Sequence, residues 1–272
     1  MPARLTVAVV TYNPDPVLLR HTVESLAIAS NQARADGVLA GTRLLLVDNG
    51  PQESAALVRE VADEWPAALG SAEVVSGHGN VGYGRGNNAV MGRLDSDFHL
   101  VMNPDVELDA NALTAALTVL RDHPDVGLVA PAAFGDDGAR QYLCKRRPSV
   151  GVLFLRGFAP SFVRRRFTAA LDAYEMRDVI GDQLLKGVPL ASGCFMLMRT
   201  ALFRQLGGFD PRFFMYFEDY DLSLRVGRES TVAYVPGARI VHHGGDASRK
   251  GVRHIAWFVA SAWKFFSMYG WR

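Results

Sequence analysis

Cysteine is scarce in this chain of 272 residues, which contains only Cys144 and Cys194. Cys194 stands in an apolar run typical of a buried strand, so a disulfide framework is not expected. We predict instead that both thiols are packing groups, and we take a reducing cytoplasm as the default location.

The chain also lacks any apolar run of the roughly 18 residues needed to cross a bilayer. Its opening residues lead directly into a short apolar stretch with polar flanks, so no signal peptide is expected. The net charge is only +1, which gives no reason to expect nucleic acid as a partner. These absences favour an ordinary globular protein, either soluble or peripheral on a membrane.

Acidic residues are missing between Asp137 and Asp172, where basic residues alternate with apolar ones. The basic residues of this stretch are Arg140, Lys145, Arg146, Arg147, Arg156, Arg164, Arg165 and Arg166. The stretch 249–272 likewise mixes Lys and Arg with aromatic residues. Such segments suit an anionic membrane interface. A solvated basic loop followed by a docked terminal helix fits equally well, and both interpretations stay open.

Strand-like and helix-like segments alternate through the first half of the chain. This alternation predicts an α/β fold with one mostly parallel sheet and helices on both faces. The expected strands cover 5–11, 43–47, 73–76, 98–102 and 126–130, and the expected helices cover 15–29, 53–65, a segment from 87, and 110–122.

The second half begins with the basic, aromatic segment 140–186, which we expect to face the acceptor or a membrane. Strands are predicted at 193–198 and 231–235 and a helix at 200–206. No internal repeat or low-complexity linker interrupts the chain. We therefore predict one domain over 1–247 and an amphipathic helical extension over 248–272.

Polar residues follow several of the predicted strands. Asn13 follows the first strand, Asp48 the second, a glycine-rich loop the third and Asp105 the fourth. Ligands bind beyond the carboxyl ends of the strands in such sheets. Asp48 fits an Asx turn in Asp-Asn-Gly, and it can also accept the imide N–H of uracil or thymine. The loop 78–88 contains G-x-G-x-G rather than the dinucleotide fingerprint, yet it still permits close approach to phosphate or sugar.

An acidic element, Tyr-Phe-Glu-Asp-Tyr-Asp-Leu at 216–222, is embedded in aromatic residues. A carboxylate that loses water has a raised pKa, which suits a general base near neutral pH. The alternative is an acidic first turn of a surface helix, which the helix dipole favours. His242 and His243 form a further pair; such pairs are often structural, but a histidine also suits Mn²⁺ or a leaving phosphate.

Taken in order, these motifs resemble inverting glycosyltransferases of family 2 with the GT-A fold, and within them the bacterial rhamnosyltransferase branch. The likeness covers about residues 4–270. It is carried by Val-Val-Thr-Tyr-Asn at 9–13, Val-Asp-Asn at 47–49, Asn-Val-Gly-Tyr-Gly-Arg-Gly-Asn-Asn at 80–88, Asn-Pro-Asp-Val at 103–106, Ser-Gly-Cys-Phe-Met-Leu at 192–197, Gly-Gly-Phe-Asp at 207–210, the acidic element, and His-His at 242–243.

The resemblance implies a role for each matching residue. Asp219 is the catalytic base, with Glu218 beside it. Asp105 and either His242 or His243 hold Mg²⁺ or Mn²⁺ and the diphosphate. The residues implied in nucleotide-sugar binding are Thr11, Asn13, Asp48, Asn80, Gly82, Arg85, Asn88, Asn103 and Asp105. Asn103 replaces the first carboxylate of the usual Asp-x-Asp motif, so weak, donor-dependent metal binding is expected.

The implied activity is transfer of L-rhamnose from dTDP-L-rhamnose to a lipid-linked or growing cell-surface glycan. The acceptor is expected on a polyprenyl diphosphate at the inner face of the bacterial cytoplasmic membrane, where the enzyme is peripheral. UDP-galactofuranose, UDP-glucose or a GDP-sugar such as GDP-mannose remain alternative donors. A non-catalytic binding module and a Rossmann oxidoreductase are alternatives of other classes, although the first strand lacks the oxidoreductase glycine turn. A homodimer stays open.

Overall fold

The computed structural model describes residues 1–244 and 251–271. Its strands are β1 (Ala3–Thr11), β2 (Leu39–Asp48), β3 (Ala72–Val75), β4 (Phe98–Met102), β5 (Val106–Leu108), β6 (Val126–Phe134), β7 (Arg140–Gln141), β8 (Leu185–Lys186), β9 (Phe195–Arg199) and β10 (Thr231–His242). Its helices are α1 (Pro16–Ala35), α2 (Ala55–Asp63), α3 (Tyr83–Asn88), α4 (Ala112–Asp122), α5 (Val150–Phe158), α6 (Ser161–Arg166), α7 (Thr168–Tyr174), α8 (Thr200–Gln205), α9 (Glu218–Glu229) and α10 (Val252–Tyr269).

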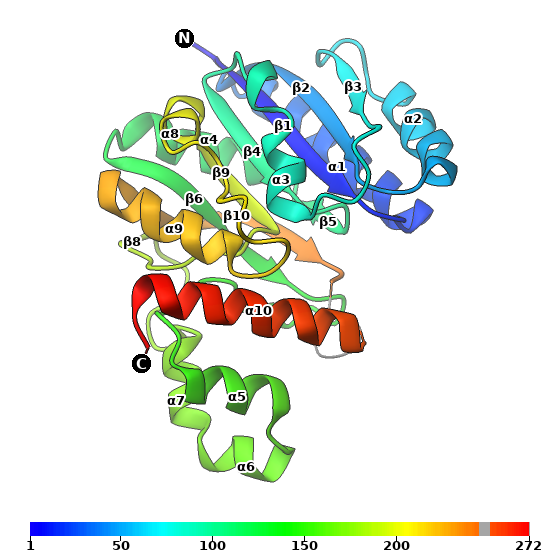
Figure 1. The fold of residues 1–272 in the computed structure, drawn as a ribbon. Coiled ribbons are helices and arrows are strands. Elements are labelled where there is room, and N and C mark those ends of the chain that lie inside the picture. The colour runs from blue at the N-terminus through cyan, green and yellow to red at the C-terminus, as the bar shows by residue number, and fades with distance from the viewer. Residues whose placement is uncertain (245–250, 272) are drawn as a thin grey trace.

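The strands form one sheet in the order β3-β2-β1-β4-β9-β6-β10-β5, seen across Figure 1. Neighbours from β3 to β4 are parallel, and β6 is parallel to β10. β9 lies between β4 and β6 and is antiparallel to both. The predicted α/β fold with a mostly parallel sheet and flanking helices is confirmed.

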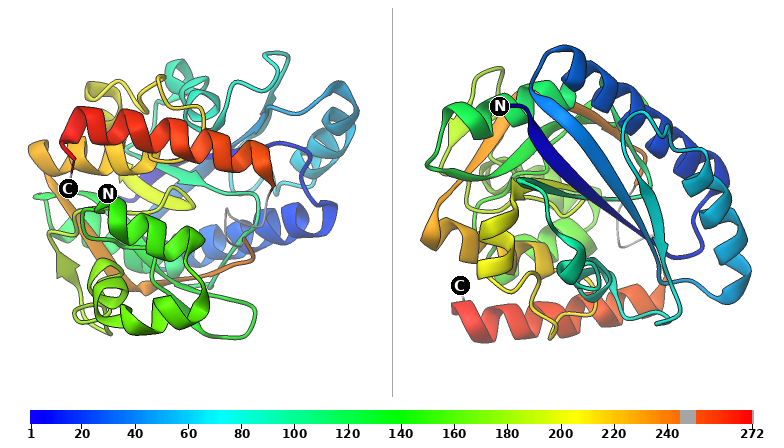
Figure 2. Two further views of the ribbon diagram at one scale, coloured as in Figure 1. Left: turned by 60° about the horizontal axis from the view of Figure 1, so that its bottom comes forward. Right: turned by 90° about the horizontal axis from the view of Figure 1, so that it is seen from above.

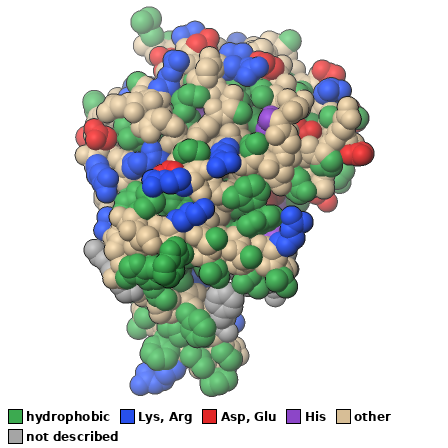
Figure 3. Space-filling view, in the orientation of Figure 1, with side chains coloured by type: hydrophobic (Ala, Val, Ile, Leu, Met, Phe, Trp, Pro, Cys, Tyr) green, Lys and Arg blue, Asp and Glu red, His purple; other side chains and the backbone are tan. Residues whose placement is uncertain are grey.

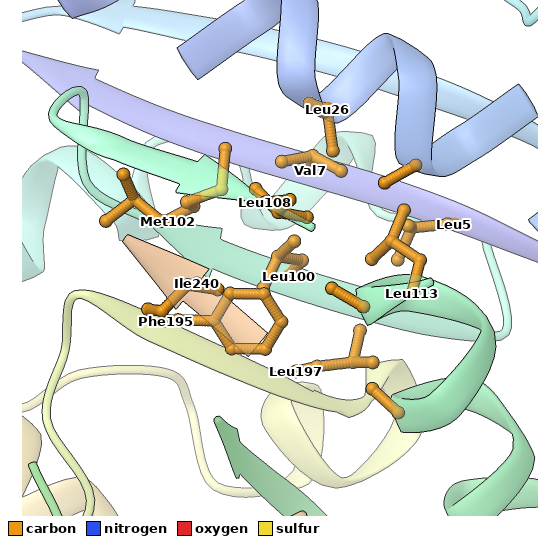
Figure 4. Close-up of a cluster of buried hydrophobic side chains, with 14 of the residues drawn as sticks. Leu5, Val7, Leu26, Leu100, Met102, Leu108, Leu113, Phe195, Leu197 and Ile240 are labelled. Atoms are coloured by element: carbon orange, nitrogen blue, oxygen red, sulfur yellow. The ribbon is translucent and has the colours of Figure 1, made fainter. Parts of the chain in front are cut away.

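Helices cover both faces of this sheet because the strand residues alternate in direction. Along β1, Leu5, Val7 and Val9 pack on the side of α1, α2 and α4, whereas Ala8 and Val10 pack on the other side. Figure 4 shows the first cluster, to which Leu26 of α1, Leu113 of α4 and Leu100 of β4 belong. Burying these side chains is the main stabilising contribution to the fold.

The segment that follows β6 forms a feature of its own. Helices α5, α6 and α7 project from the body of the protein below α10 (Figure 1), and Figure 2 shows α10 lying across one side of the molecule. A third apolar cluster joins these parts: Leu153 of α5 and Tyr174 of α7 pack with Phe217, Phe265 and Phe266. The hydrophobic contacts of α10 thus lie on the same side as the acidic element.

Two predicted elements differ from the structure. α3 begins at Tyr83 rather than near Asn87, because the loop turns sharply at Gly82. The two apolar runs after Thr231 belong to one strand, β10, whose register against β6 shifts between Val235 and Arg239. Both cysteines are buried and free, and burial raises the pKa of each thiol to about 12, consistent with a packing role.

Candidate active site

Three of the predicted site residues meet at the carboxyl edge of the parallel strands. Thr11 ends β1 directly beside Asp48 of β2, and Asn103 follows β4, the other neighbour of β1. Asp48 is buried and accepts hydrogen bonds from the backbone N–H of Gly50 at 2.9 Å and from Ser54 Oγ at 3.1 Å. The Asx turn is therefore present. Asn13 is exposed at the same edge, with a left-handed φ of 45°.

The glycine-rich loop is fastened to the aromatic segment before α9. The backbone N–H of Tyr83 donates to the carbonyl of Phe214 at 3.1 Å. Gly82 has a φ of 87°, and a Cβ there would lie 2.1 Å from the same carbonyl oxygen. Asn80 caps the turn by accepting the Gly82 N–H at 3.1 Å, while Asn49 Nδ2 donates to the Gly82 carbonyl at 3.0 Å. Only glycine fits this close approach.

Arg85 and Asn88, on α3, contact the chain just before the acidic element. Asn88 donates to the Phe209 carbonyl at 2.7 Å and accepts the Phe209 N–H at 2.9 Å. Arg85 donates through Nε to the Pro211 carbonyl at 2.8 Å and is otherwise exposed. These bonds place α3 against the loop 207–217; nucleotide-sugar binding by either residue stays a prediction.

Asp105 and His242 come together through the pairing of β5 with the end of β10. This antiparallel pair aligns His242 with Val106, the residue after Asp105. Asp105 Oδ1 lies 3.7 Å from Nε2 of His242. Nδ1 of His242 is 3.0 Å from Oε1 of Gln141, an atom that only accepts hydrogen bonds, so Nδ1 is the donor there. In the neutral ring, the Nε2 lone pair then faces Asp105.

His243 has different surroundings. Its Nε2 lies 2.9 Å from Glu107 Oε1, and its Nδ1 lies 2.5 Å from Asp136 Oδ1. Both ring nitrogens thus contact carboxylates other than Asp105. The sequence left the two histidines as alternatives, and the geometry favours His242 as the partner of Asp105.

The space between Asp105 and His242 suits a divalent cation. Oδ1 of Asp105 is buried and has no hydrogen-bond partner among the described residues. A Cβ on Gly244 would lie 2.5 Å from His242 Nε2 and 2.7 Å from Asp105 Oδ2, so only glycine leaves this space open. Within residues 1–244 and 251–271, no group of three His, Cys, Asp or Glu side chains is arranged as a metal site. The residues therefore fit a metal whose other ligands come from substrate and water.

Asp219 lies at the start of α9, opposite β9. Its Oδ2 accepts the backbone N–H of Gly193 at 2.9 Å, which aligns the carboxylate with the chain entering β9. Tyr216 and Phe217, just before the helix, both have left-handed φ values, 69° and 66°. Two such residues in succession store backbone strain, which is common where a site must be held in position.

Burial sets the protonation of the acidic pair. It raises the pKa of Asp219, although hydrogen bonds from the backbone N–H groups of Gly193 and Tyr220 oppose the shift. Burial, reinforced by the negative charge of Asp219, raises the pKa of Glu218 further above the ordinary carboxyl range. Oε2 of Glu218 is buried without a hydrogen-bond partner in the described part of the chain. The structure therefore favours a neutral Glu218 beside an Asp219 able to exchange a proton near neutral pH.

These carboxyl groups open into a cavity of about 580 Å³. Asp219 and Glu218 line it on one side, His242 and Gly244 line it as well, and the basic segment closes it with Lys145, Arg156, Glu175 and Arg177. The last four were not singled out as site residues from the sequence. The acid-free stretch pointed to Lys145 and Arg156, but nothing in it pointed to Glu175 or Arg177.

Comparison with known proteins identifies the family. A family described as "Glycosyltransferase like family 2" matches residues 2–258. The chain belongs to glycosyltransferase family 2. Glycosyltransferase activity follows from this membership, and the oxidoreductase alternative is excluded.

Two curated relatives of this glycosyltransferase are rhamnosyltransferases. One, N-acetylglucosaminyl-diphospho-decaprenol L-rhamnosyltransferase from Mycobacterium tuberculosis, is 28% identical over 270 residues, 93% of this chain and 80% of that protein. The other, rhamnosyltransferase WbbL from Escherichia coli, is 23% identical and covers 71% of this chain and 72% of that protein. The likeness to the rhamnosyltransferase branch is thus confirmed as distant homology.

Solved structures share the fold of this glycosyltransferase. A crystal structure of GalNAc-T7 with UDP, GalNAc and Mn²⁺ has a TM-score of 0.62 at 14% identity, covering 91% of this chain and 44% of that one. The mannosyltransferase PcManGT from Pyrobaculum calidifontis, with GDP-Man and Mn²⁺, has a TM-score of 0.61 at 16% identity, covering 97% and 65%. This chain spans less than half of the first structure and under two thirds of the second. The expected GT-A fold is confirmed.

We expect Gly82→Ala to destabilise the loop by more than its backbone conformation alone explains. The matched control is Gly79→Ala, which has a φ of 65° but no atom within 4 Å of its Cβ position. The control should lose roughly 1–2 kcal/mol, the cost of a left-handed non-glycine residue. Denaturant unfolding measures both variants, and equal losses would contradict the contact with Phe214.

We expect Glu218→Gln to stabilise the protein at neutral and alkaline pH. The folded state keeps the Glu218 proton where the unfolded chain releases it, so stability falls as pH rises from the ordinary carboxyl range through the raised pKa. The amide cannot ionise and avoids this loss, which is about 1.4 kcal/mol for every tenfold difference in acidity between the folded and unfolded states. Melting temperatures of variant and wild type should converge at acid pH. A variant less stable than wild type at pH 8 would show that the carboxylate is favourable.

Proposed function

We propose that this glycosyltransferase transfers L-rhamnose from dTDP-L-rhamnose to a lipid-linked or growing cell-surface glycan, with inversion at the anomeric carbon. The observation that carries the mechanism is the half-buried Asp219, aligned by Gly193 and facing the same cavity as His242. The donor and acceptor are supported by the two rhamnosyltransferase relatives, one of which is named for a diphospho-decaprenol acceptor. The alternative is the same chemistry with a UDP- or GDP-sugar.

The donor nucleotide is proposed to bind along the carboxyl edge. Thr11, Asn13 and Asp48 would surround the base, and the fastened loop from Asn80 to Gly82 would approach the ribose and diphosphate. Asn103, Arg85 and Asn88 complete the proposed nucleotide-sugar site. Asp48 already accepts from Gly50 and Ser54, which holds its carboxylate in one orientation for the base.

The donor diphosphate is proposed to lie beside Asp105 and His242. These residues would hold Mg²⁺ or Mn²⁺, because a carboxylate oxygen and an imidazole nitrogen face one open space there. When bound, the ion would stabilise the negative charge of the departing nucleoside diphosphate. Two structures with the same fold contain Mn²⁺ with a nucleotide or nucleotide sugar, which agrees with this assignment.

Asp219 acts as the general base. Its carboxylate takes the proton of the acceptor hydroxyl as that oxygen attacks the anomeric carbon on the face opposite the leaving group. The bond to the diphosphate oxygen breaks in the same displacement, so one step inverts the anomeric centre. Glu218, kept neutral by burial, adds no second negative charge beside Asp219.

Removing the base should separate catalysis from donor binding. We expect Asp219→Asn to lower kcat by about 10²–10⁴-fold, the usual contribution of a general base. Glu218→Gln should cost far less, because an amide resembles the neutral carboxylic acid. Initial rates with dTDP-L-rhamnose and a lipid-diphosphate acceptor measure kcat, and a separate titration measures donor affinity, which should not change in Asp219→Asn. If Asp219→Asn kept full activity, Asp219 would not be the base.

Membrane contact is proposed for the projecting α5–α7 region and the outer face of α10. Figure 3 shows apolar side chains over both parts. Phe162 is 67% exposed and Trp263 is 65% exposed, and α6 ends in three exposed arginines, Arg164, Arg165 and Arg166. No helix in the described ranges is long and apolar enough to span a membrane. Exposed aromatic and basic groups together suit an anionic bilayer surface.

Vesicle sedimentation tests this surface. Wild type should bind vesicles containing anionic lipid, and replacing Arg164, Arg165 and Arg166 by Ser should weaken binding more than tenfold, since each contributes about 1 kcal/mol near such a surface. Arg59→Ser, an exposed change on α2, serves as the control. Equal binding of all three proteins, or no wild-type binding, would remove the proposed membrane contact.

A further inference from the structure

The part of the cavity wall that the basic segment forms carries an excess of positive charge. Lys145 Nζ lies 3.1 Å from Glu175 Oε1, Arg156 Nε lies 3.6 Å from the same oxygen, and Arg177 Nη2 lies 2.6 Å from Glu175 Oε2. Three cations thus share one carboxylate. Asp172 contacts Arg177 at 3.2 Å from the exposed side, so it offsets only part of this excess.

The centre of the cluster is largely removed from water, whereas the side chains of Arg156 and Arg177 are about half exposed. The Lys145 side chain is 6% exposed and that of Glu175 is 15% exposed. Burial, together with the positive charge of Arg156, lowers the pKa of Lys145 to about 8, although Glu175 opposes the shift. Arg177 is fixed over the ring of Tyr142, 4.5 Å from its centroid. Cations crowded in this way gain from an added anion.

The cluster also lies next to the catalytic base. Glu175 follows Tyr174 in the chain, and the Tyr174 hydroxyl is 2.7 Å from the hydroxyl of Tyr220, the residue after Asp219. The cations and Asp219 line the same cavity. An anion on Lys145, Arg156 and Arg177 would therefore lie in the cavity of the base, on other residues than the Asp105–His242 pair.

Apolar residues continue from the cluster toward the protein surface. Leu153 and Phe258 line the cavity beside Arg156, on α5 and α10 respectively. Next to Leu153 in the chain, Phe154 is 60% exposed on α5. The wall thus places apolar side chains beside the positive charges. This combination matches a diphosphate group attached to a hydrocarbon chain.

We propose that Lys145, Arg156 and Arg177 form a second anion site, which binds the diphosphate of a polyprenyl-linked acceptor and positions its sugar hydroxyl at Asp219. The identity of this ligand as an acceptor rests on the proposed function. The residues named here bind substrate and take no part in proton transfer. The donor diphosphate is proposed to bind at a different part of the same cavity, beside Asp105 and His242.

Calorimetric titration of farnesyl diphosphate tests the site, using full-length protein saturated with dTDP and Mg²⁺ so that the donor site is occupied. Wild type should bind one farnesyl diphosphate, and farnesol should bind far more weakly. Arg156→Gln and Arg177→Gln, each tested alone, should lower the affinity for farnesyl diphosphate at least tenfold and leave the affinity for dTDP unchanged. Arg147→Gln is the matched control, because Arg147 is an exposed arginine of the same basic run, as Arg156 is, but does not line this cavity. Melting temperatures identify any variant that loses its fold. If one arginine variant does so, the farnesyl diphosphate affinity of the other variant tests the proposal.

The outcomes separate this site from the proposed function. The cluster would belong to the donor site if farnesyl diphosphate competed with dTDP, or if the arginine variants lost affinity for farnesyl diphosphate and dTDP equally. Either result would overturn the proposal. Unchanged farnesyl diphosphate affinity in the folded variants would overturn it too. If dTDP and other nucleoside diphosphates failed to bind while the binding of farnesyl diphosphate still depended on Arg156, the proposed donor would be wrong and the anion site would be supported.

Discussion

The pairing of β5 with the end of β10 is the constraint on which the candidate site depends. β5 follows Asp105 after a short turn from β4, and the last residues of β10 pair with β6 on one edge and with β5 on the other. This pairing brings His242 next to Asp105. It likewise brings His243 next to Glu107, which lies 136 positions earlier in the sequence. Gln141, from the short strand β7 beside β6, then orients the His242 ring. A small change of strand register would separate the proposed metal ligands.

The second half of the site depends on burying charge close to this edge. The strained turn at Tyr216 and Phe217 directs Glu218 into an apolar environment and leaves Asp219 at the cavity, with α10 packed behind through Phe265. In the same cavity, three cations surround Glu175. The proposed base thus shares one cavity with both proposed diphosphate sites, as a sugar transfer between two diphosphate-linked molecules would require.

Much of this could be predicted from the sequence, because strand ends followed by Asp48, Asp105 and the glycine loop mark a carboxyl edge in any parallel sheet. The choice between His242 and His243 could not. Adjacent strand residues point to opposite faces, and which face meets Asp105 depends on a register shift that no local pattern reveals. Helices α5–α7 were also missed, since each is short, and only α5 and α7 pack on residues distant in the sequence, such as Phe265 of α10. For the same reason Glu175 and Arg177 did not stand out.

The most direct test of this account is calorimetric titration of dTDP-L-rhamnose with and without Mn²⁺, using wild type, Asp105→Asn, His242→Gln and His243→Gln. The account predicts that Mn²⁺ strengthens donor binding in wild type and in His243→Gln, and that this gain is lost in Asp105→Asn and His242→Gln. A gain that persisted in both of the latter variants would contradict the assignment of the donor diphosphate to the space between Asp105 and His242.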